Sequence, residues 1–253
     1  MEPNAATQPK QIPADSAGSK RKAAIEIAVA YLLILAVIWA PRPVQRYLWI
    51  AAVMGIVVIL WRSFDGWKAM GFTTANLGRS LWIVAVALGL AAAAILVALR
   101  IHTLLLPAGA IDFVEGYLAY AVWTGVQQFL LQGFFLLRLL RVTPKGWVAA
   151  LAAAVLFAAA HLPNPVLTPI TLVWGFVACM LFLRYRNIYP LMVVHAILGI
   201  TVALTVPGPV DHNMRVGLGY LTYNRWAHRH QLHRPVAPEL RLDPGPTPGS
   251  AQP

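Results

Sequence analysis

Residues 81–99 read LWIVAVALGLAAAAILVAL and carry no charged side chain. An uninterrupted apolar run of this length is close to the roughly 20 residues that a helix needs to cross a bilayer. Six more runs of spanning or near-spanning length occur along the chain. They cover residues 23–40, 47–61, 117–137, 147–162, 166–183 and 188–206. These runs predict an all-α fold, a polytopic membrane helix bundle of about seven transmembrane helices, or eight if one more span exists.

The composition supports a membrane protein and excludes several other classes. Hydrophobic residues make up 59% of the chain and charged residues 11%, against about 45–50% and about 25% in soluble domains. A soluble domain of 253 residues could not cover its surface with so few charges. The single cysteine, Cys179, excludes an intramolecular disulfide and a cysteine-rich metal site. A disordered protein, a disulfide scaffold and an ordinary soluble enzyme are therefore excluded.

The net charge of +11 follows the pattern that orients a membrane protein. With the amino terminus in the cytoplasm, the segments on that side hold 12 Lys and Arg residues, and the loops on the other side hold 3. Cytoplasmic loops carry an excess of Lys and Arg, so we predict a cytoplasmic amino terminus, in the bacterial inner membrane. No zinc-finger or RNP-type motif occurs, so we expect no nucleic acid. Membrane lipids, including anionic ones, are the expected partners.

The chain divides into three regions. Residues 1–22 are polar and rich in Ala, Pro, Ser and Gln, which is typical of a disordered tail. Residues 23–206 form the predicted bundle, and residues 207–253 form an extramembrane tail that is disordered towards its end. Glycine and tyrosine in the first part of this tail suit an interface-bound segment. We expect it to fold back over the outer mouth of the bundle near His161, with order ending by about His228.

Polar side chains occur at membrane depth in three helices, where such groups are rare and usually face a cavity or a partner. Gln127 and Gln128 are adjacent on the fourth helix, and Gln132 lies one turn beyond. His161 ends the fifth helix, and His195 lies about two turns into the seventh. Taken singly, the glutamines are explained by interhelical hydrogen bonds. Taken singly, His161 is explained as an interface residue and His195 as a structural one.

The three segments together form an ordered pattern. They read Gln127-Gln128-Phe-Leu-Leu-Gln132, Phe157-Ala-Ala-Ala-His161 and Tyr189-Pro-Leu-Met-Val-Val-His195-Ala-Ile-Leu-Gly199. This arrangement resembles the CPBP family of intramembrane proteases, also called the Abi or CAAX prenyl protease 2 family. The family pattern is E-E-x-x-x-R on one helix, F-x-x-x-H on the next and H-x-x-x-N on a later one. The resemblance covers residues 116–206 and implies a membrane peptidase core that acts on peptides or lipidated peptides.

The resemblance implies catalytic roles from which this chain departs. In the family the first glutamate activates water, the histidines assist, and the final Asn helps to hold the oxyanion. Glutamine stands here for both glutamates and for the arginine, and Gly199 stands for the Asn. Glutamine cannot accept a proton near neutral pH, and losing a general base costs roughly 10²–10⁴ in rate. We expect a retained scaffold with a degenerate site. Its candidate catalytic residues are His161, His195, Gln127 and Gln128.

No nearby carboxylate is an evident substitute for the glutamates. Glu115 is 12 residues before Gln127, which is about 18 Å along a helix at ~1.5 Å per residue. Glu26 begins another helix. The predicted topology also places His161 near the outer end of its helix and His195 near the inner end of its own. Helix tilt, or a fifth helix that starts deeper, must bring the two histidines together.

Several functions remain open. One is a weakened or inactive CAAX-protease-like peptidase, and a second is a non-catalytic protein that binds a peptide, a lipid or a partner helix in the same cavity. A third is a metal-dependent activity on the outer face, built from His161, His212 and Asp211, because imidazole and carboxylate suit zinc or manganese. A fourth is a transporter, although no inverted repeat is visible. We expect no cofactor, since the ligand spacing for a divalent metal is not clear, and the oligomeric state is left open.

Overall fold

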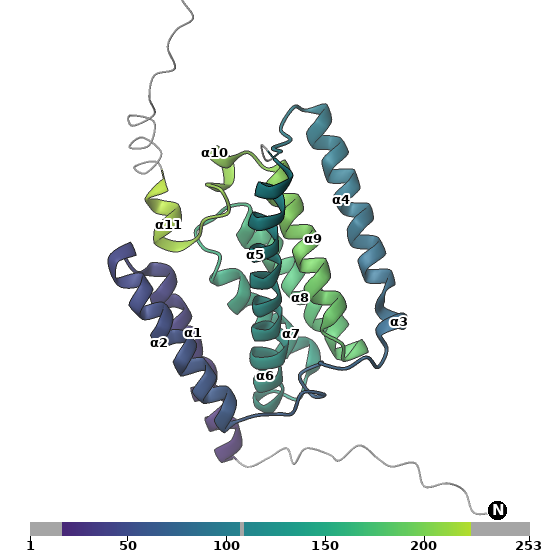
Figure 1. Cartoon of the computed structure of the whole chain (residues 1–253). Coiled ribbons are helices and arrows are strands. Elements are labelled where there is room, and N and C mark those ends of the chain that lie inside the picture. Colours follow the sequence, from purple (N-terminus) through teal and green to yellow (C-terminus); the bar gives the residue numbers. More distant parts are fainter. Residues whose placement is uncertain (1–16, 107–108, 224–253) are drawn as a thin grey trace, which may run out of the picture.

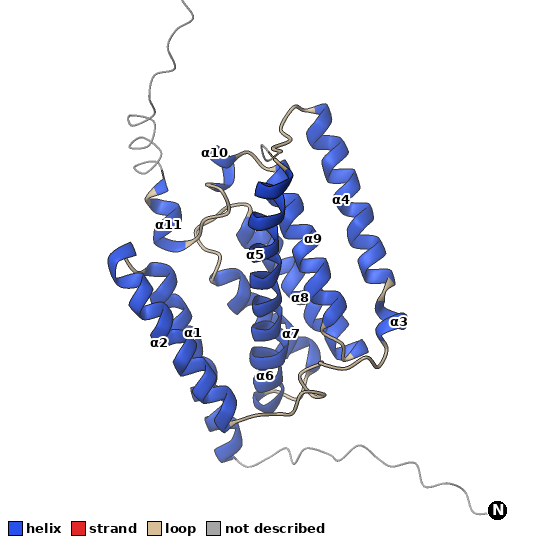
Figure 2. Cartoon of the chain, viewed as in Figure 1, coloured by secondary structure: helices blue, strands red, loops and turns tan. Residues whose placement is uncertain are grey.

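The chain is an all-α membrane bundle, as predicted. The computed structural model describes residues 17–106 and 109–223, and these contain helices, turns and loops but no strand (Figure 2). Each of the seven apolar runs is mostly helical. The helices are α1 (Ala17–Trp39), α2 (Arg42–Arg62), α3 (Leu77–Ser80), α4 (Trp82–Arg100), α5 (Ala110–Gln128), a π-helix (Phe129–Leu136), α6 (Leu137–Val142), α7 (Gly146–Ala159), α8 (Leu167–Tyr185), α9 (Tyr189–Thr205), α10 (Gly208–Asp211) and α11 (Gly217–Leu221).

Four helices in the described part are long and apolar enough to cross a membrane: Ala17–Trp39, Arg42–Arg62, Leu77–Arg100 and Leu167–Tyr185. Two shorter apolar helices are Gly146–Ala159 and Tyr189–Thr205. Helix α2 is longer than its apolar run because it starts at Arg42, with proline in its first turn. Proline is tolerated there, since the first amides of a helix have no intrahelical partner. The amino-terminal orientation of the bundle stays a prediction.

The centre of the bundle is built on small residues. Helices α7 and α8 pack closely, and α9 packs against both α4 and α5. On α7, Ala150, Ala153 and Ala154 are fully buried. A Cβ on Gly175 of α8 would lie 3.3 Å from the backbone of Ala154, so these two helices approach as closely as their backbones allow. Small residues at helix interfaces give this kind of close packing in membranes.

One long helix changes its winding in the middle. Helix α5 continues directly into the π-helix of residues 129–136 and then into α6. The π-helix carries Gln132, and Gln128 and Thr124 precede it, and all three side chains are fully buried. These three side chains therefore face the interior of the bundle. Short π segments inside α-helices occur frequently at functional sites.

Helices α1 and α2 form a hairpin at one side of the bundle (Figure 1). Helix α1 packs against α6 and α11, whereas α2 packs mainly against α1. The rings of Trp49 on α2 and Trp123 on α5 are 5.8 Å apart, which is a direct contact between these two helices. The hairpin is therefore held to the rest of the protein mainly by one face of α1.

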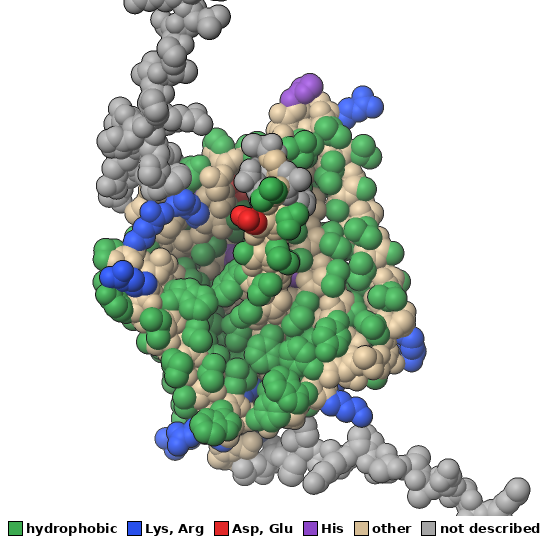
Figure 3. Space-filling view, in the orientation of Figure 1, with side chains coloured by type: hydrophobic (Ala, Val, Ile, Leu, Met, Phe, Trp, Pro, Cys, Tyr) green, Lys and Arg blue, Asp and Glu red, His purple; other side chains and the backbone are tan. Residues whose placement is uncertain are grey.

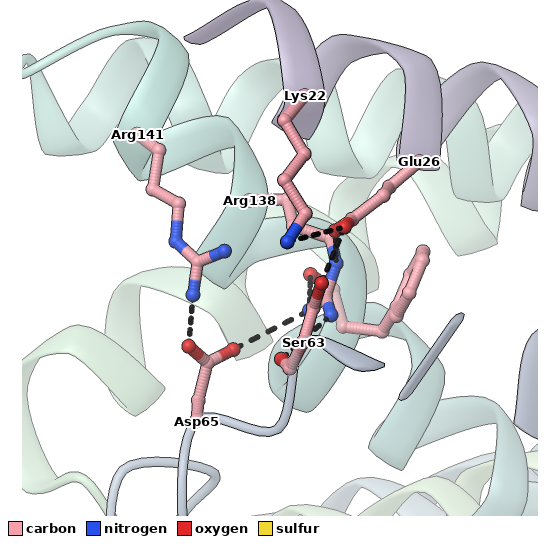
Figure 4. Close-up of polar contacts among 7 residues, drawn as sticks. Lys22, Glu26, Ser63, Asp65, Arg138 and Arg141 are labelled. Carbon is pink, nitrogen blue, oxygen red and sulfur yellow. Dashed lines mark hydrogen bonds and ion pairs between the residues drawn. The ribbon is translucent and has the colours of Figure 1, made fainter. Parts of the chain in front are cut away.

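A buried charge cluster fixes one end of this hairpin (Figure 4). The Arg138 side chain of α6 is fully buried, and its Nε donates to Glu26 of α1 at 2.8 Å. Its Nη1 lies 3.4 Å from Asp65, which also pairs with Arg141. The hydroxyl of Ser63 donates to Glu26. The cluster joins α1, the loop after α2 and α6, and the sequence motifs do not predict it.

Candidate functional site

One large cavity opens on the face between α2 and α5, where Figure 3 shows the surface hollowed with histidine visible inside. Its volume is about 660 Å³, within the range of small-molecule and cofactor sites. Three of the predicted site residues line it, namely Gln127, His161 and His195. Most of the other lining side chains are apolar, and most come from α1, α2, α5, the π-helix, α7, α8 and α9.

The two histidines meet through Phe157 of the F-x-x-x-H segment. The Phe157 ring centroid lies 4.8 Å from that of His161 and 5.8 Å from that of His195, edge-on in both cases. His161 lies in the turn directly after α7, and its Nδ1 is 2.7 Å from the Phe157 carbonyl oxygen. His195 is buried, and its Nδ1 has no hydrogen-bond partner among the described residues.

The short length of α7 explains how the histidines come together. The helix has 14 residues, which gives a length of about 21 Å at 1.5 Å per residue. This is less than the ~30 Å thickness of a hydrocarbon core. His161 therefore lies inside the bundle and lines the cavity. Its role is more than that of a residue at the membrane interface. Because α7 is short, the predicted topology is compatible with both histidines lining one cavity.

The glutamines divide between the cavity and the packed interior. Gln127 is half-buried and lines the cavity. Gln128 and Gln132 are fully buried and do not line it. Neither of their side-chain amides has a hydrogen-bond partner in the part of the chain that the structure describes. Burying an amide without a partner costs free energy. Gln128 and Gln132 therefore destabilise the packed interior, and they make it polar beside the cavity.

Tyr120 is a site residue that the motifs do not predict. It lines the cavity from α5 and lies against Gly199 of α9. A Cβ on Gly199 would lie 2.8 Å from two carbons of the Tyr120 ring and closer still to its hydroxyl oxygen. The phenol therefore occupies the space that any side chain at position 199 would need. Tyr120 is seven residues before Gln127, a spacing that places both on one helical face, and this spacing is the sequence signal that points to it.

The segment after α9 folds back over this end of the bundle, next to His161, as the tail composition predicts. The Asn164 amide donates to the backbone oxygens of Asp211 at 2.7 Å and Arg215 at 3.0 Å. The Gly217 amide donates to Leu162 at 2.7 Å. Gly217 has a φ of +54°, and a Cβ there would lie 3.0 Å from the carbonyl carbon of Ile38 on α1. The expected end of order near His228 lies outside the described residues.

The metal-site alternative finds no support in residues 17–106 and 109–223, where no group of three or more His, Cys, Asp or Glu side chains could hold one ion. The His212 ring is stacked on Tyr220, with ring centroids 4.0 Å apart. The Asp211 carboxylate is buried and accepts a hydrogen bond from the Asn213 amide at 2.9 Å. Both side chains therefore hold the fold of the tail.

Asp211 provides a pH-dependent test of this arrangement. Burial raises the pKa of Asp211 above the ordinary value of 3.8, although backbone amides of Met214 and Asn213 lower it. The folded state therefore binds this proton more readily than the unfolded chain, so the free energy of unfolding falls as pH rises from 3.8 through the raised pKa. Asp211→Asn keeps the acceptor oxygen and removes the charge. Its stability at pH 7 should equal or exceed that of the wild type, with a weaker pH dependence.

Thermal unfolding in detergent between pH 4 and pH 7 measures this effect. Asp211→Ala is the matched control, because it removes both the charge and the acceptor, and it should lose about 1–3 kcal/mol. Asp211→Asn as damaging as Asp211→Ala would mean that the negative charge itself stabilises the tail.

Residues 111–201 match the sequence model of the family described as type II CAAX prenyl endopeptidase Rce1-like. This range contains the three motif segments and the cavity residues Gln127, His161 and His195. No curated protein and no solved structure matches the chain. This match confirms the resemblance predicted from the three motifs, and this part of the integral membrane chain is similar to the CAAX prenyl endopeptidases.

Proposed function

We propose that this protein holds a membrane-embedded or lipidated peptide in the cavity and that glutamate-dependent hydrolysis has been lost. The observation that carries the proposal is the chemistry of the cavity wall. It contains two histidines and Gln127, but no Asp or Glu lines it among the described residues. A neutral amide can hydrogen-bond to a peptide or a water, but it cannot take a proton from water near neutral pH.

The nearest candidate carboxylates are engaged or distant. Glu26 is paired with Arg138 and with the hydroxyl of Ser63, in a cluster apart from the cavity wall. Glu115 is exposed on α5 and does not line the cavity. Neither side chain replaces a general base beside Gln127. This supports a scaffold that binds in preference to one that cleaves.

A second candidate function is a slow, histidine-dependent peptidase. It is favoured by the shared packing of His161 and His195 on Phe157, which holds two imidazoles at one site. Histidine is the commonest general acid or base in enzymes. On this alternative, His161→Ala abolishes the remaining cleavage.

A farnesylated peptide with a photocrosslinking group separates the two functions. The wild-type protein in lipid vesicles should crosslink the peptide at cavity residues and release no detectable product. The Gln127→Glu, Gln128→Glu variant should still bind, and any cleavage that it gains should stay below the roughly 10²–10⁴-fold effect of a positioned general base, because Gly199 supplies no side-chain donor.

Two outcomes decide between the functions. Slow wild-type cleavage that disappears in His161→Ala would establish the peptidase instead. Robust cleavage that survives loss of both histidines, or the absence of any crosslink in the cavity, would overturn the assignment of this site.

A further inference from the structure

Among the described residues, three side chains with a hydroxyl group line the cavity, and they differ in how the hydroxyl is bonded. The Tyr31 hydroxyl donates to the backbone oxygen of Leu156 at 3.0 Å. The Thr171 hydroxyl donates to the backbone oxygen of Leu167 at 2.7 Å. The half-buried Tyr120 has no hydrogen-bond partner for its hydroxyl in the part of the chain that the structure describes. Tyrosine hydroxyls usually find a partner when the ring is buried, so a ligand in the cavity is the natural source of one.

The Tyr120 phenol is positioned by its packing against α9. A Cβ at Gly199 would lie 2.8 Å from two carbons of the Tyr120 ring and closer still to its hydroxyl oxygen. The missing side chain of Gly199 therefore allows the hydroxyl to lie against the α9 backbone. Gly199 follows His195 by four residues, which is about one helical turn. The hydroxyl thus lies about one turn along α9 from a histidine of the cavity wall.

A second polar side chain of the cavity lies on the same face of α5. Gln127 follows Tyr120 by seven residues, and both line the cavity. Seven residues rise about 10 Å along a helix, which is close to the length of three residues of extended chain at ~3.3 Å each. The Gln127 amide can both donate and accept a hydrogen bond. One extended peptide segment can therefore reach both side chains.

We propose that the Tyr120 hydroxyl donates a hydrogen bond to a backbone carbonyl oxygen of a peptide that lies extended along α5, and that Gln127 contacts the same peptide about three residues away. A carbonyl is the favoured partner because the phenol oxygen shares its lone pair with the ring and therefore donates more strongly than it accepts. The surrounding wall is mainly apolar, and a hydrogen bond is stronger where the local dielectric constant is low. This inference rests on the proposed function, since it names a contact of the peptide in the same cavity.

Tyr120→Phe tests the hydroxyl alone, because it keeps the ring that packs against Gly199. The farnesylated photocrosslinking peptide is titrated against the full-length protein in lipid vesicles, and the crosslink yield gives the Kd. The variant should raise the Kd by about threefold to tenfold, the net effect of one hydrogen bond. It should unfold at the temperature of the wild type, because no hydrogen bond within the described part of the protein is lost.

Tyr31→Phe is the matched control, since it makes the same change on the same cavity wall in a residue whose hydroxyl is bonded to Leu156. It should lower the unfolding temperature and leave the Kd of the peptide unchanged. The same result in Tyr120→Phe, a lower unfolding temperature with an unchanged Kd, would show that the Tyr120 hydroxyl serves the fold and would overturn the proposal.

A series of the same peptide, each member with one backbone carbonyl oxygen replaced by sulfur, identifies the bonded carbonyl. Sulfur is the weaker acceptor, so one member should bind the wild type less tightly than the parent peptide does. That member and the parent should bind Tyr120→Phe equally, which is the coupling expected of two groups in contact. Equal effects of sulfur in both proteins at every position would overturn the proposal and leave the peptide site in place. No crosslink to the wild-type cavity would instead reject the proposed function, and this inference with it.

Discussion

Glu26→Ala should destabilise the protein by about 3–5 kcal/mol, the typical cost of leaving a buried charge without its partner. The Arg138 guanidinium is fully buried and donates to Glu26 at 2.8 Å. After the substitution its remaining acidic neighbour is Asp65, at 3.4 Å, which Arg141 also engages. Thermal unfolding in detergent, or unfolding in mixed SDS micelles, measures the loss.

Two further variants separate the charge from the packing. Lys22→Ala is the matched control, since Lys22 is exposed and lies 3.9 Å from the same carboxylate, and exposed pairs contribute only ~0–1 kcal/mol. Replacing both members of the pair by apolar residues, as in Glu26→Met with Arg138→Met, should recover much of the loss, because a buried ion pair can be exchanged for apolar packing at little cost. A loss of stability in Lys22→Ala equal to that in Glu26→Ala would mean that the buried pair is not the cause.

Gly199→Ala should destabilise the protein by about 1–3 kcal/mol, as overpacking does, although alanine ordinarily stabilises a helix relative to glycine. The reason is the Tyr120 ring, which lies 2.8 Å from the position of the new Cβ. Gly89→Ala on α4 is the matched control, because its Cβ would meet no atom within 4 Å. It should stabilise the protein by roughly 0.5–1 kcal/mol.

The same contact governs any attempt to restore the family pattern. Gly199→Asn alone should displace Tyr120 and lower stability at least as much as Gly199→Ala. Tyr120→Ala in the same chain should relieve the clash, so the two substitutions together should cost less than their sum. Additive losses in this double-mutant cycle would show that Tyr120 does not set the space at position 199.

The helices were predictable because apolar length alone specifies a membrane span. The motif positions Gln127, His161 and His195 were predictable because they are polar groups at membrane depth in a recognisable order, and the cavity joins all three. The Glu26–Arg138 pair was not, since 112 residues separate its members and only packing brings them together. The contact between Tyr120 and Gly199 was likewise not predictable, since these residues lie on different helices and only packing brings them together.

The orientation of the bundle and the loss of chemistry at Gln127 and Gln128 remain predictions, because charge distribution and motif spacing do not by themselves establish either. The start of α2 was also not predicted by the apolar pattern. The apolar run begins at residue 47, whereas the helix begins at Arg42. A polar first turn with proline gives no hydrophobic signal, so pattern alone places the helix start too late.

The position of α2 determines how a ligand reaches the site. Because α2 packs mainly on α1, with the Trp49–Trp123 contact to α5, the cavity lies open on a face that carries much exposed apolar surface. On the proposed function, a molecule dissolved in the bilayer would reach the histidines by lateral diffusion, without crossing bulk water. By mass action, the occupancy of the cavity would then follow the mole fraction of that molecule among the surrounding lipids. Its concentration in water would matter only through its partitioning into the bilayer.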